Sequence, residues 1–350
     1  MRILINTPSL KLMGGVANHY LGLKPFWNEK IQYNTVGKRS EKSGSGKYWL
    51  PWDVVKFLFR LFFFRPNVVL LNPSLGASAL RRDFIFLRIA CALGFKVVMF
   101  IHGFNWEYAK TVNKPWIVRN LNRASLILIL ANAFREEMKK WGVVSPICLT
   151  TTKVNDFLLD GYNIENTRSG KVKNILFLAR VEREKGVFIA IDSYRILKKR
   201  YPYLNLIIVG EGSALSKVKQ IVNEERIADV RIMGKLWGED LINAYKESDL
   251  FSAASYGEGM PTAVLEAMAF GLPVFTRRVG GLVDFFEDGK MGYITNSLDP
   301  EDFANAMVPY IENPELTKKV TLYNAQYAQE HFMASNVAKQ IESTIYKYIK

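Results

Sequence analysis

The chain has 350 residues, of which 49% are hydrophobic, and its formal net charge is +14. A single hydrophobic core stops growing near about 250–300 residues, so two domains are expected. No apolar run reaches the roughly 18 residues of a spanning helix, and residues 1–6 have the pattern of a strand rather than a signal peptide. We therefore expect a cytoplasmic protein, which could still lie peripherally on the inner face of the cell membrane. Cys91 and Cys148 have no metal-ligand spacing and are expected to be buried, reduced thiols.

The positive charge is concentrated in the first half of the chain. Residues 1–170 contain 24 Lys and Arg against 10 Asp and Glu, a balance of +14, whereas residues 171–350 contain 23 of each kind and balance to zero. Such an asymmetry suggests an anionic partner, either nucleic acid or a membrane surface. A basic surface that serves only solubility is the alternative explanation.

In the first half, short apolar runs alternate with helical patterns. The runs are residues 2–6, 67–72, 96–102 and 126–132. Because Val, Ile and Leu occupy consecutive positions rather than alternate ones, these runs are typical of parallel strands that are covered on both faces. The pattern predicts an α/β domain with a doubly wound parallel sheet.

One helix of this half, within residues 49–65, is unusually aromatic. It contains two tryptophans and five phenylalanines, and Lys56 and Arg60 lie four residues apart on one face. Asp53 could cap its start. Such a helix could lie in a membrane interface. It could equally be an ordinary crossover helix packed on its sheet, and the sequence leaves both readings open.

The second half repeats the same plan. Strands are expected at residues 174–179, 205–210, 230–233, 250–253 and 273–276, and helices at 187–200, 240–247 and 262–270. The polar stretch 160–173 lacks periodicity and is expected to be the linker. We therefore expect domains at 1–165 and 166–325, and a helical tail at 326–350 that could pack back on the first domain. Two Rossmann-like sheets would face each other across a cleft at the carboxyl ends of their strands.

The most informative stretch runs from Ser255 to Gly281. The strand at 250–253 ends in a glycine-flanked turn, and Pro261 stands near the first position of the next helix, where its missing N–H is not needed. The free N–H groups of that first turn, contributed by Gly259, Met260, Thr262 and their neighbours, form an anion site that suits a pyrophosphate.

Two carboxylates bracket this site. Glu258 precedes the helix and Glu266 lies within it, eight positions later. Carboxylates accept pairs of hydrogen bonds, so they suit the neighbouring hydroxyls of a sugar and of a ribose on either side of a diphosphate. The alternative is that glutamates are simply favoured in the first turns of helices, where they interact with the helix dipole.

This stretch resembles the donor-site signature of the retaining glycosyltransferases of family 4, also called glycosyl transferases group 1, which have the GT-B fold of two Rossmann-like domains. The resemblance implies that Glu258 contacts the hydroxyls of the transferred sugar and that Glu266 contacts the ribose of the nucleotide. The sequence Glu-Gly-Met-Pro at 258–261 departs from the commoner Glu-Gly-Phe-Gly, which could alter the sugar pocket but keeps the backbone donors.

A second match lies at the start of the same half, where Arg180 and Lys185 follow the strand at 174–179. The resemblance implies that they hold the diphosphate. A fixed guanidinium and ammonium can stabilise a departing nucleoside diphosphate without a metal. No Asp-x-Asp pair stands at a comparable strand end, so we expect no metal and no cofactor, with the nucleotide sugar as co-substrate. A solvated basic turn is the alternative reading of these two residues.

Three further residues match the family more weakly. Gly15 follows Gly14 at the start of a helix and permits close approach of the backbone to a phosphate or an acceptor. The resemblance implies that His102, at the end of the strand 96–102, touches the donor sugar, and that Lys235 lies near the base. A single histidine at a strand end is more often structural.

The resemblance implies a metal-independent hexosyltransferase that retains the anomeric configuration, with His102, Glu258, Arg180 and Lys185 as catalytic residues. Together with the basic first half, it favours an acceptor glycan that is lipid-linked or membrane-borne, as in the assembly of capsule, O-antigen or lipopolysaccharide, and an anionic membrane surface as a partner.

Four alternatives compete with this reading. A nucleotide-sugar epimerase or a phosphorylase of the same fold stays possible, although the sequence shows no phosphorylase-type lysine site for pyridoxal phosphate. A nicotinamide-dependent dehydrogenase would need a Gly-x-Gly-x-x-Gly motif that residues 7–16 do not supply. A nucleic-acid-binding protein would leave Glu258 and Glu266 without a role, and no recognition motif is present, so we expect no nucleic-acid partner.

Overall fold

The computed structural model describes residues 1–12, 14–37, 39, 46–167 and 169–349. The chain forms two compact units, one of Met1–Lys153 with Ala334–Lys350 and the other of Val154–Met333. The chain therefore passes from the first unit to the second after Lys153 and not at residue 165. It returns to the first unit after Met333 and not at residue 325. A parallel bridge between Val154 and Met333 ties both ends of the second unit together, which explains these positions.

The sheet of the first unit has six parallel strands in the order β2-β1-β3-β4-β5-β6. They are β1 (Arg2–Thr7), β2 (Lys30–Thr35), β3 (Val68–Leu71), β4 (Lys96–Ile101), β5 (Leu126–Ile129) and β6 (Ile147–Leu149). All residues of β3 and β5 are buried, as expected for strands covered on both faces. The sequence did not predict β2 and β6, which lie at the two edges, where a strand needs no continuous apolar run.

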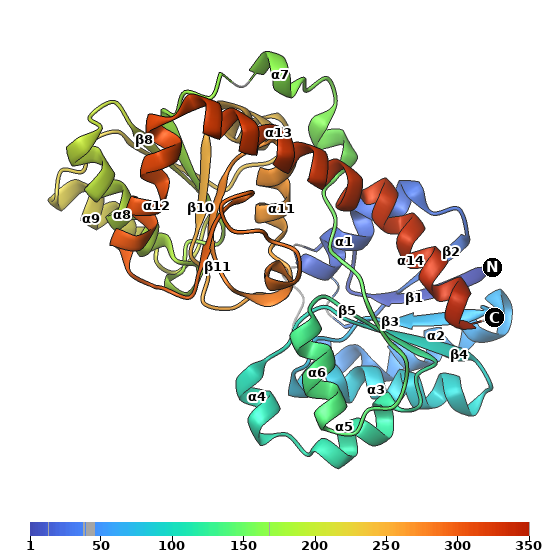
Figure 1. Cartoon of the computed structure of the whole chain (residues 1–350). Helices are drawn as coiled ribbons and strands as arrows, with labels where there is room; N and C mark the ends of the chain where they lie inside the picture. Colours follow the sequence, from blue (N-terminus) through green and yellow to red (C-terminus); the bar gives the residue numbers. More distant parts are fainter. Residues whose placement is uncertain (13, 38, 40–45, 168, 350) are drawn as a thin grey trace. The chain divides into compact units, whose positions relative to one another are not determined.

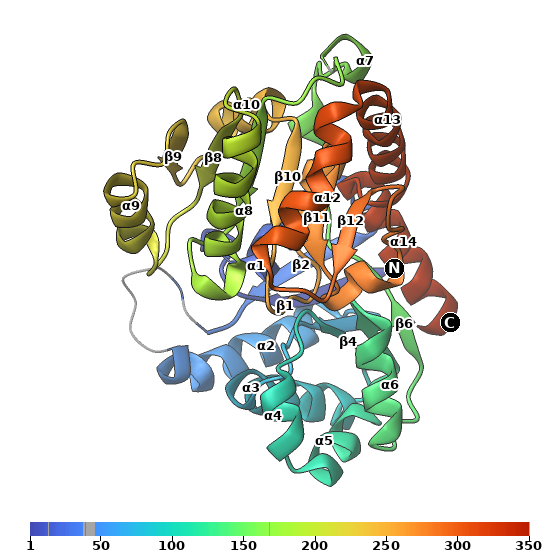
Figure 2. The ribbon, with the colours of Figure 1, turned by 60° about the vertical axis from the view of Figure 1, so that its left-hand side comes forward.

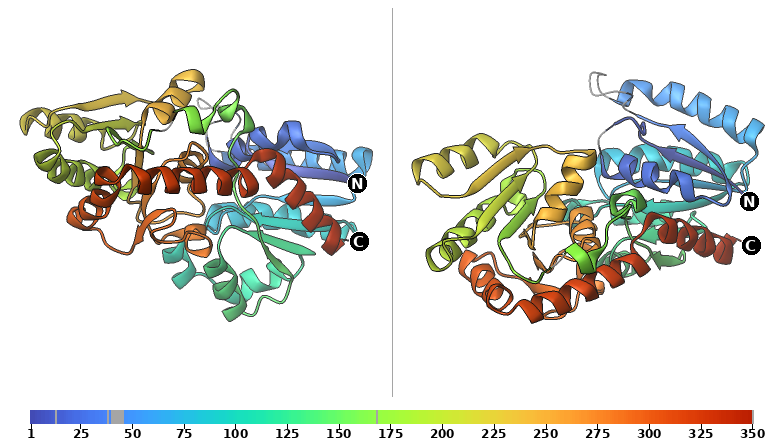
Figure 3. Two further views of the ribbon diagram at one scale, coloured as in Figure 1. Left: turned by 45° about the horizontal axis from the view of Figure 1, so that its top comes forward. Right: turned by 90° about the horizontal axis from the view of Figure 1, so that it is seen from above.

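Helices cover both faces of this sheet. They are α1 (Gly15–Leu23), α2 (Leu50–Phe64), α3 (Ala77–Ala92), α4 (Trp106–Thr111), α5 (Lys114–Leu121), α6 (Asn132–Lys140) and α14 (Ala334–Ile349). The terminal helix α14, red in Figures 1 and 3, packs against α1 and the short helix η1 (Lys24–Phe26). The backbone N–H groups of Asn28 and Glu29 each donate to Oε1 of Glu342 at 2.9 Å. These contacts make the end of the chain part of the first unit.

Helix α2 has one buried and one exposed apolar face. Asp53, Phe57 and Leu61 are buried. Asp53 lies inside the first turn and does not cap the helix; it accepts a hydrogen bond from the Gly37 N–H at 2.7 Å and pairs with Arg39. The large apolar side chains that point outward are Trp52, Val55, Phe59, Phe62 and Phe63. One face therefore packs in the unit, as expected of a crossover helix, and the other is exposed; the membrane-interface reading stays a prediction.

The second unit has another six-stranded parallel sheet, in the order β12-β11-β10-β7-β8-β9. Its strands are β7 (Asn174–Leu178), β8 (Asn205–Val209), β9 (Val230–Gly234), β10 (Leu250–Ala253), β11 (Val274–Arg277) and β12 (Gly292–Thr295). The sequence predicted five of them and missed β12, a four-residue edge strand. Two doubly wound parallel sheets, as expected, are confirmed.

Helices cover both faces of this second sheet (Figure 2). Helices α8 (Val187–Arg200), α9 (Leu215–Glu224) and α12 (Pro300–Glu312) share one hydrophobic core. Helices α10 (Gly238–Glu247), α11 (Thr262–Ala269) and α13 (Pro314–His331) share the other. Both cores are continuous with the buried side chains of the strands between them.

The expected linker at 160–173 is largely packed against the second unit. The Tyr162 hydroxyl donates to the Phe270 carbonyl at 3.0 Å. Short helix α7 (Ile164–Thr167) contacts α13, and a Cβ placed on Gly271 would lie 2.4 Å from Cδ1 of Ile164. Residue 168 lies outside the described residues. The polar composition of this stretch therefore marks a surface segment of the second unit and not the crossing between the units.

Each sheet reverses its strand order at one point, between β1 and β3 in the first unit and between β7 and β10 in the second. In open parallel sheets the carboxyl ends of the strands at such a point form the usual ligand-binding crevice. The segment after β7 contains Arg180 and Lys185, and the segment after β10 contains Glu258. Three predicted residues of the second unit therefore follow the two strands at its switch point.

The two cysteines differ from the expectation, because both are half-buried and free. The Cys91 thiol donates to the Arg123 carbonyl at 3.5 Å, and partial burial raises the pKa of this thiol. Cys148 lies on the short edge strand β6, whose three residues are all half-buried. The thiol of Cys91 is therefore protonated at neutral pH.

Candidate functional site

The side chains of Lys185 and Glu258 form an ion pair at the switch point of the second sheet. Nζ of Lys185 donates to Oε1 of Glu258 at 2.5 Å, and the two side chains are only 16% and 18% exposed. Lys185 ends the short helix η4 (Arg183–Lys185), and Glu258 lies in the loop after β10. The structure thus brings together two residues that the sequence assigned to one site, although the ammonium group contacts the carboxylate that was expected to hold a sugar.

Backbone contacts fix the two loops that carry this pair. The Tyr256 N–H donates to the Glu184 carbonyl at 2.8 Å. Gly186 has φ +80, and a Cβ at this position would lie 2.5 Å from the Ala254 carbonyl oxygen. Only glycine combines this backbone conformation with such a close approach. The short distance between Lys185 and Glu258 therefore rests on the main chain as well as on charge.

The glycine pair at 280–281 holds the other side of the Glu258 loop. The Gly281 N–H donates to the Gly259 carbonyl at 2.8 Å. Gly280 has φ +53, and a Cβ there would lie 2.2 Å from the same carbonyl oxygen. Arg277, at the end of β11, donates to the Ser255 carbonyl at 3.3 Å. The two ends of the motif from Ser255 to Gly281 are therefore joined by hydrogen bonds.

Helix α11 begins directly after this loop. Pro261 is its N-cap residue, one position before the first helical residue, and no described side chain caps the helix start. Gly259, Met260 and Thr262 are half-buried around it. Because the first N–H groups of a helix have no carbonyl partner within the helix and lie at the positive end of its dipole, this start favours an anion.

Glu266 lies further along α11 and is only 8% exposed. The hydroxyl of Tyr245, on helix α10, donates to its Oε2 at 2.8 Å. Tyr245 is fully buried and stacks on Phe270 with ring centroids 4.9 Å apart. Burial, and then the nearby Glu266 carboxylate, raise the pKa of Tyr245 well above its usual value. The tyrosine hydroxyl therefore stays a hydrogen-bond donor to Glu266.

Arg180 lies at the surface of the loop after β7. Its side chain is 67% exposed and pairs with Glu182 at 2.8 Å. The Val181 N–H donates to the Glu211 carbonyl at 2.9 Å, and a Cβ on Gly212 would lie 2.4 Å from the Val181 carbonyl oxygen. The Gly-Glu-Gly turn after β8 thus supports the loop that presents Arg180.

Lys235 belongs to a different part of this edge. It follows β9, which β8 separates from β7, and its ammonium lies 5.0 Å from the ring centroid of Trp237. Trp237 is exposed. This cation–π contact provides a flat aromatic surface beside a positive charge.

In the first unit, the half-buried His102 contacts a cluster of buried polar residues. Its Nε2 lies 3.0 Å from Oδ1 of Asn72, which also accepts a hydrogen bond from the Tyr20 hydroxyl at 2.6 Å. The amide nitrogen of Asn72 donates to the Asn6 carbonyl at 2.8 Å. Because an amide oxygen can only accept, Nε2 of His102 carries the proton and Nδ1 is the acceptor.

Burial lowers the pKa of His102 to about 3, so this imidazole is neutral at pH 7. The ring stacks on Phe100 with centroids 3.8 Å apart, and His19 lies edge-on to it at 5.3 Å. His102 is therefore a hydrogen-bonding group and not a cation.

Gly15 opens helix α1 after β1, at the switch point of the first sheet. Its N-cap Gly14 provides no side-chain cap, and both glycines are exposed with no atom within 4 Å of an added Cβ. The start of α1 is thus open to a ligand.

The sequence did not point to Tyr245, Tyr20 or Asn72. Only Asn72 carried a usable signal, because it is a polar residue at the end of an apolar run. His102 and Gly15 lie in the first unit, and the other predicted residues lie in the second.

Two doubly wound parallel sheets, with charged side chains at the switch point of the second, define a protein of the GT-B fold. Residues 163–327 match the family Glycosyl transferases group 1. The match covers α11 and every predicted site residue of the second unit.

Curated relatives align with just under half of the chain. A D-inositol 3-phosphate glycosyltransferase of Corynebacterium jeikeium is 28% identical over 169 residues, which is 46% of this chain and 39% of the relative. A mannosylfructose-phosphate synthase of Agrobacterium fabrum is 29% identical over 181 residues, or 49% of this chain and 39% of the relative. The chain thus spans about two fifths of the length of these relatives.

Solved structures match the whole chain. Anabaena Alr3699/HepE in complex with UDP and glucose has a TM-score of 0.72 at 18% identity, with 99% of both chains covered. The sucrose-phosphate synthase of Thermosynechococcus elongatus has a TM-score of 0.75 at 15% identity and covers 99% of this chain and 98% of its own. At these identities the likeness confirms the fold.

Proposed function

We propose that the chain is a retaining glycosyltransferase that transfers a sugar from a nucleoside-diphosphate sugar to a glycan acceptor. The observation that carries this proposal is the Lys185–Glu258 ion pair, which lies at the switch point directly before the start of α11. The group 1 family match at 163–327 and the names of the relatives support it. An Anabaena structure of the same fold that contains UDP and glucose supports a nucleotide-sugar donor.

Different residues of the second unit bind different parts of the nucleotide-sugar donor. The start of α11, with Gly259, Met260 and Thr262, binds the diphosphate through backbone N–H groups. Glu258 accepts hydrogen bonds from the hydroxyls of the transferred sugar, and Glu266, oriented by Tyr245, accepts those of the ribose. The Lys235–Trp237 surface contacts the base.

Transfer proceeds by attack on the face that the leaving group occupies. The acceptor oxygen forms a bond to the anomeric carbon as the bond from that carbon to the phosphate oxygen breaks, and the departing phosphate oxygen takes the acceptor proton. Arg180 and Lys185 stabilise the charge of the nucleoside diphosphate, so no divalent metal is required. Neutral His102 accepts a hydrogen bond from a donor hydroxyl at Nδ1, and the open start of α1 at Gly15 completes the donor contacts.

The acceptor is a lipid-linked or membrane-borne glycan, of the kind built in capsule, O-antigen or lipopolysaccharide assembly, and the protein works at the inner face of the membrane. The exposed aromatic face of α2 supports this, because phenylalanines up to 73% exposed lie on a helix of a strongly basic segment. Among the described residues, no helix is both long and apolar enough to cross a membrane.

Donor binding can be tested without knowledge of the acceptor. A panel of nucleotide sugars is added to the protein and the shift in thermal unfolding is measured, with Glu266→Ala as the variant that should lose protection. Slow hydrolysis of the nucleotide sugar that protects the protein is then followed in excess chelator. NMR identifies which anomer of the sugar is released first. Retained configuration and preserved turnover support the proposal, whereas inversion, or loss of turnover with chelator, would contradict it. An epimerised donor would indicate the epimerase instead.

A further inference from the structure

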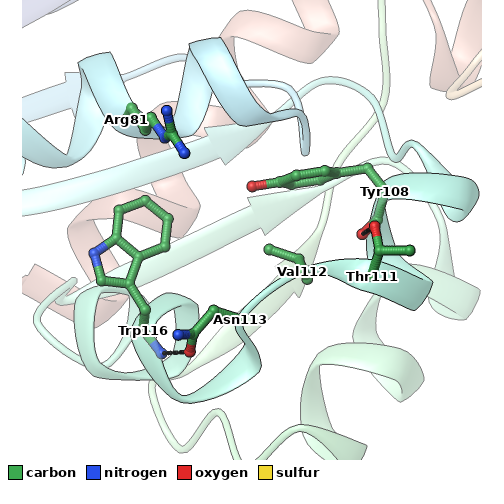
Figure 4. Close-up of a pocket in the computed structure, with 6 residues that line it drawn as sticks. All are labelled: Arg81, Tyr108, Thr111, Val112, Asn113 and Trp116. Carbon is green, nitrogen blue, oxygen red and sulfur yellow. Dashed lines mark hydrogen bonds between the residues drawn. The ribbon is translucent and has the colours of Figure 1, made fainter.

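The first unit contains a cavity of about 550 Å³ that is separate from the polar cluster at His102. Figure 4 shows the residues that line it, which come from α3, α4, α5 and the short connection between the last two: Arg81, Tyr108, Thr111, Val112, Asn113 and Trp116. None of these six side chains is acidic. The cavity combines one cation, two aromatic rings and small polar groups.

The cavity lies on the segments that follow β3 and β4, the two strands whose ends carry Asn72 and His102. The Leu75 N–H donates to the Gly103 carbonyl at 2.7 Å, and the His102 N–H donates to the Pro73 carbonyl at 3.1 Å. A further bridge joins Leu75 to Phe104. Helices α3 and α4 start from these tied loops, so the cavity and His102 are built on the same edge of the sheet.

Arg81 is the charged group of the cavity. Its side chain is exposed and has no ion-pair partner anywhere in the described part of the chain, whereas the adjacent Arg82 pairs with Asp83 at 2.6 Å. A guanidinium binds carboxylate and phosphate groups with two parallel hydrogen bonds. The cavity can therefore hold an anion without first breaking an internal pair.

The aromatic residues give the cavity a fixed shape. The Trp116 ring packs on Phe84 with centroids 5.0 Å apart, and its backbone N–H donates to Oδ1 of Asn113 at 3.0 Å. In Figure 4 the Tyr108 hydroxyl points toward the side of the cavity where Arg81 and Trp116 lie. Aromatic faces with nearby hydroxyl and amide groups suit the apolar and polar edges of a sugar ring.

We propose that this cavity binds a negatively charged sugar of the acceptor glycan, with its phosphate or carboxylate group on Arg81 and its ring against Trp116 and Tyr108. The assignment to the acceptor rests on the proposed function, because only a transferase needs a second sugar site on the unit that lacks the donor motif. The net charge of +14 in residues 1–170 favours such a ligand.

The test uses four small probes with the full chain: glucose 6-phosphate, glucuronate, uncharged methyl glucoside and inorganic phosphate. Binding is measured by ligand-observed NMR for the wild type, Arg81→Gln and the control Arg119→Gln. Arg119 is an exposed arginine of α5 that does not line the cavity. We expect at least one charged sugar to bind, about tenfold more weakly to Arg81→Gln, and equally well to the control.

Glucose 6-phosphate and glucuronate distinguish a phosphate from a carboxylate ligand. Equal affinity of wild type and Arg81→Gln for the charged sugars, an equal loss in the control, or no binding of either sugar would overturn the proposal. Inorganic phosphate that binds as tightly as glucose 6-phosphate would overturn the proposal that the cavity recognises a sugar ring.

Protection against thermal unfolding by the nucleotide sugar is measured on the same samples and should not change in Arg81→Gln. If no nucleotide sugar protects the wild type against unfolding, the transferase activity and the acceptor role of the cavity are refuted. Sugar binding that depends on Arg81 would still establish the cavity as a sugar site. Intact protection without Arg81-dependent sugar binding would refute the cavity alone.

Discussion

The hydroxyl of Tyr245 donates a hydrogen bond to Oε2 of Glu266 at 2.8 Å. The two residues come from different helices, α10 and α11, and both are buried. A hydrogen bond to a carboxylate fixes the direction of its oxygen atoms as well as stabilising it. Tyr245 is therefore a positioning residue for the glutamate that we assign to the ribose.

Tyr245→Phe should weaken donor binding about tenfold, because one charge-assisted hydrogen bond is lost while the ring keeps its stacking on Phe270. The loss should appear for a nucleoside diphosphate with both ribose hydroxyls and vanish for its dideoxy analogue. Calorimetric titration of the two ligands measures this difference.

Tyr194→Phe is the matched control for this experiment. Tyr194 is equally buried in the same unit, but its hydroxyl donates to the carbonyls of Leu204 and Ala228 at 2.9 and 2.7 Å. It should lower stability without changing either affinity. An equal loss of affinity for both ligands in Tyr245→Phe would mean that the tyrosine acts only on folding.

Lys185→Met should lower turnover by about 10²–10³-fold, because it removes a cation beside the leaving group and leaves the half-buried Glu258 carboxylate without its partner. The donor-dependent rate is compared with that of Arg183→Ala, an exposed arginine of the same short helix. Turnover of Lys185→Met at the level of that control would show that the ion pair is structural.

His102 should make the protein sensitive to acid. Its pKa falls from an ordinary 6.5 to about 3 in the folded chain, so the unfolded chain binds more protons between these values. The stability that comes from the neutral ring is complete above pH 6.5 and is lost as the pH falls toward 3.

His102→Gln removes this group from the titration and should flatten the dependence by up to about 1.4 kcal/mol per pH unit. Urea midpoints of both proteins at about pH 7 and about pH 4.5 measure the effect. Identical slopes for the two proteins would refute the low pKa of His102. The pH dependence of stability that remains in His102→Gln includes the contribution of His19, whose pKa is also lowered by burial.

The exposed face of α2 should bind anionic membranes. Replacing Phe59, Phe62 and Phe63 by serine removes apolar side chains that are mostly exposed, so folding should be preserved. Co-sedimentation with liposomes rich in anionic lipid, at low salt, should fall severalfold in the triple variant. Val144→Ser, which changes an exposed apolar residue elsewhere in the same unit, should bind as wild type does. A wild type that stays in the supernatant would refute the membrane interface.

The strands that could be predicted from the sequence are those whose burial leaves a continuous apolar run. β3, with the residues Val-Val-Leu-Leu, and β5, with Leu-Ile-Leu-Ile, lie inside the first sheet and are covered on both faces. The edge strand β2 contains the half-buried Gln32 and the buried Asn34, whose amide donates to Oδ1 of Asn6 on β1 at 3.0 Å. Its residues do not form the apolar run by which the interior strands could be recognised.

The candidate site divides in a similar way. Glu258 and Lys185 could be predicted as members of one site, since each follows a strand at the carboxyl edge of one sheet. Their mutual ion pair and the contact of Tyr245 with Glu266 could not, because both depend on how separate loops and helices pack. The position at Lys153 where the chain passes between the units could not be predicted either, because the polar stretch after it packs on the second unit.

The most direct measurement for the transferase is release of nucleoside diphosphate from the protective nucleotide sugar, followed in wild type and Glu258→Gln. The amide keeps the size of the side chain but loses the charge that pairs with Lys185. We predict slow release by wild type, release at least about 100-fold slower by Glu258→Gln, and donor protection in both proteins. Equal release by the two proteins, or no release by wild type with any nucleotide sugar, would contradict the assigned site and the proposed activity.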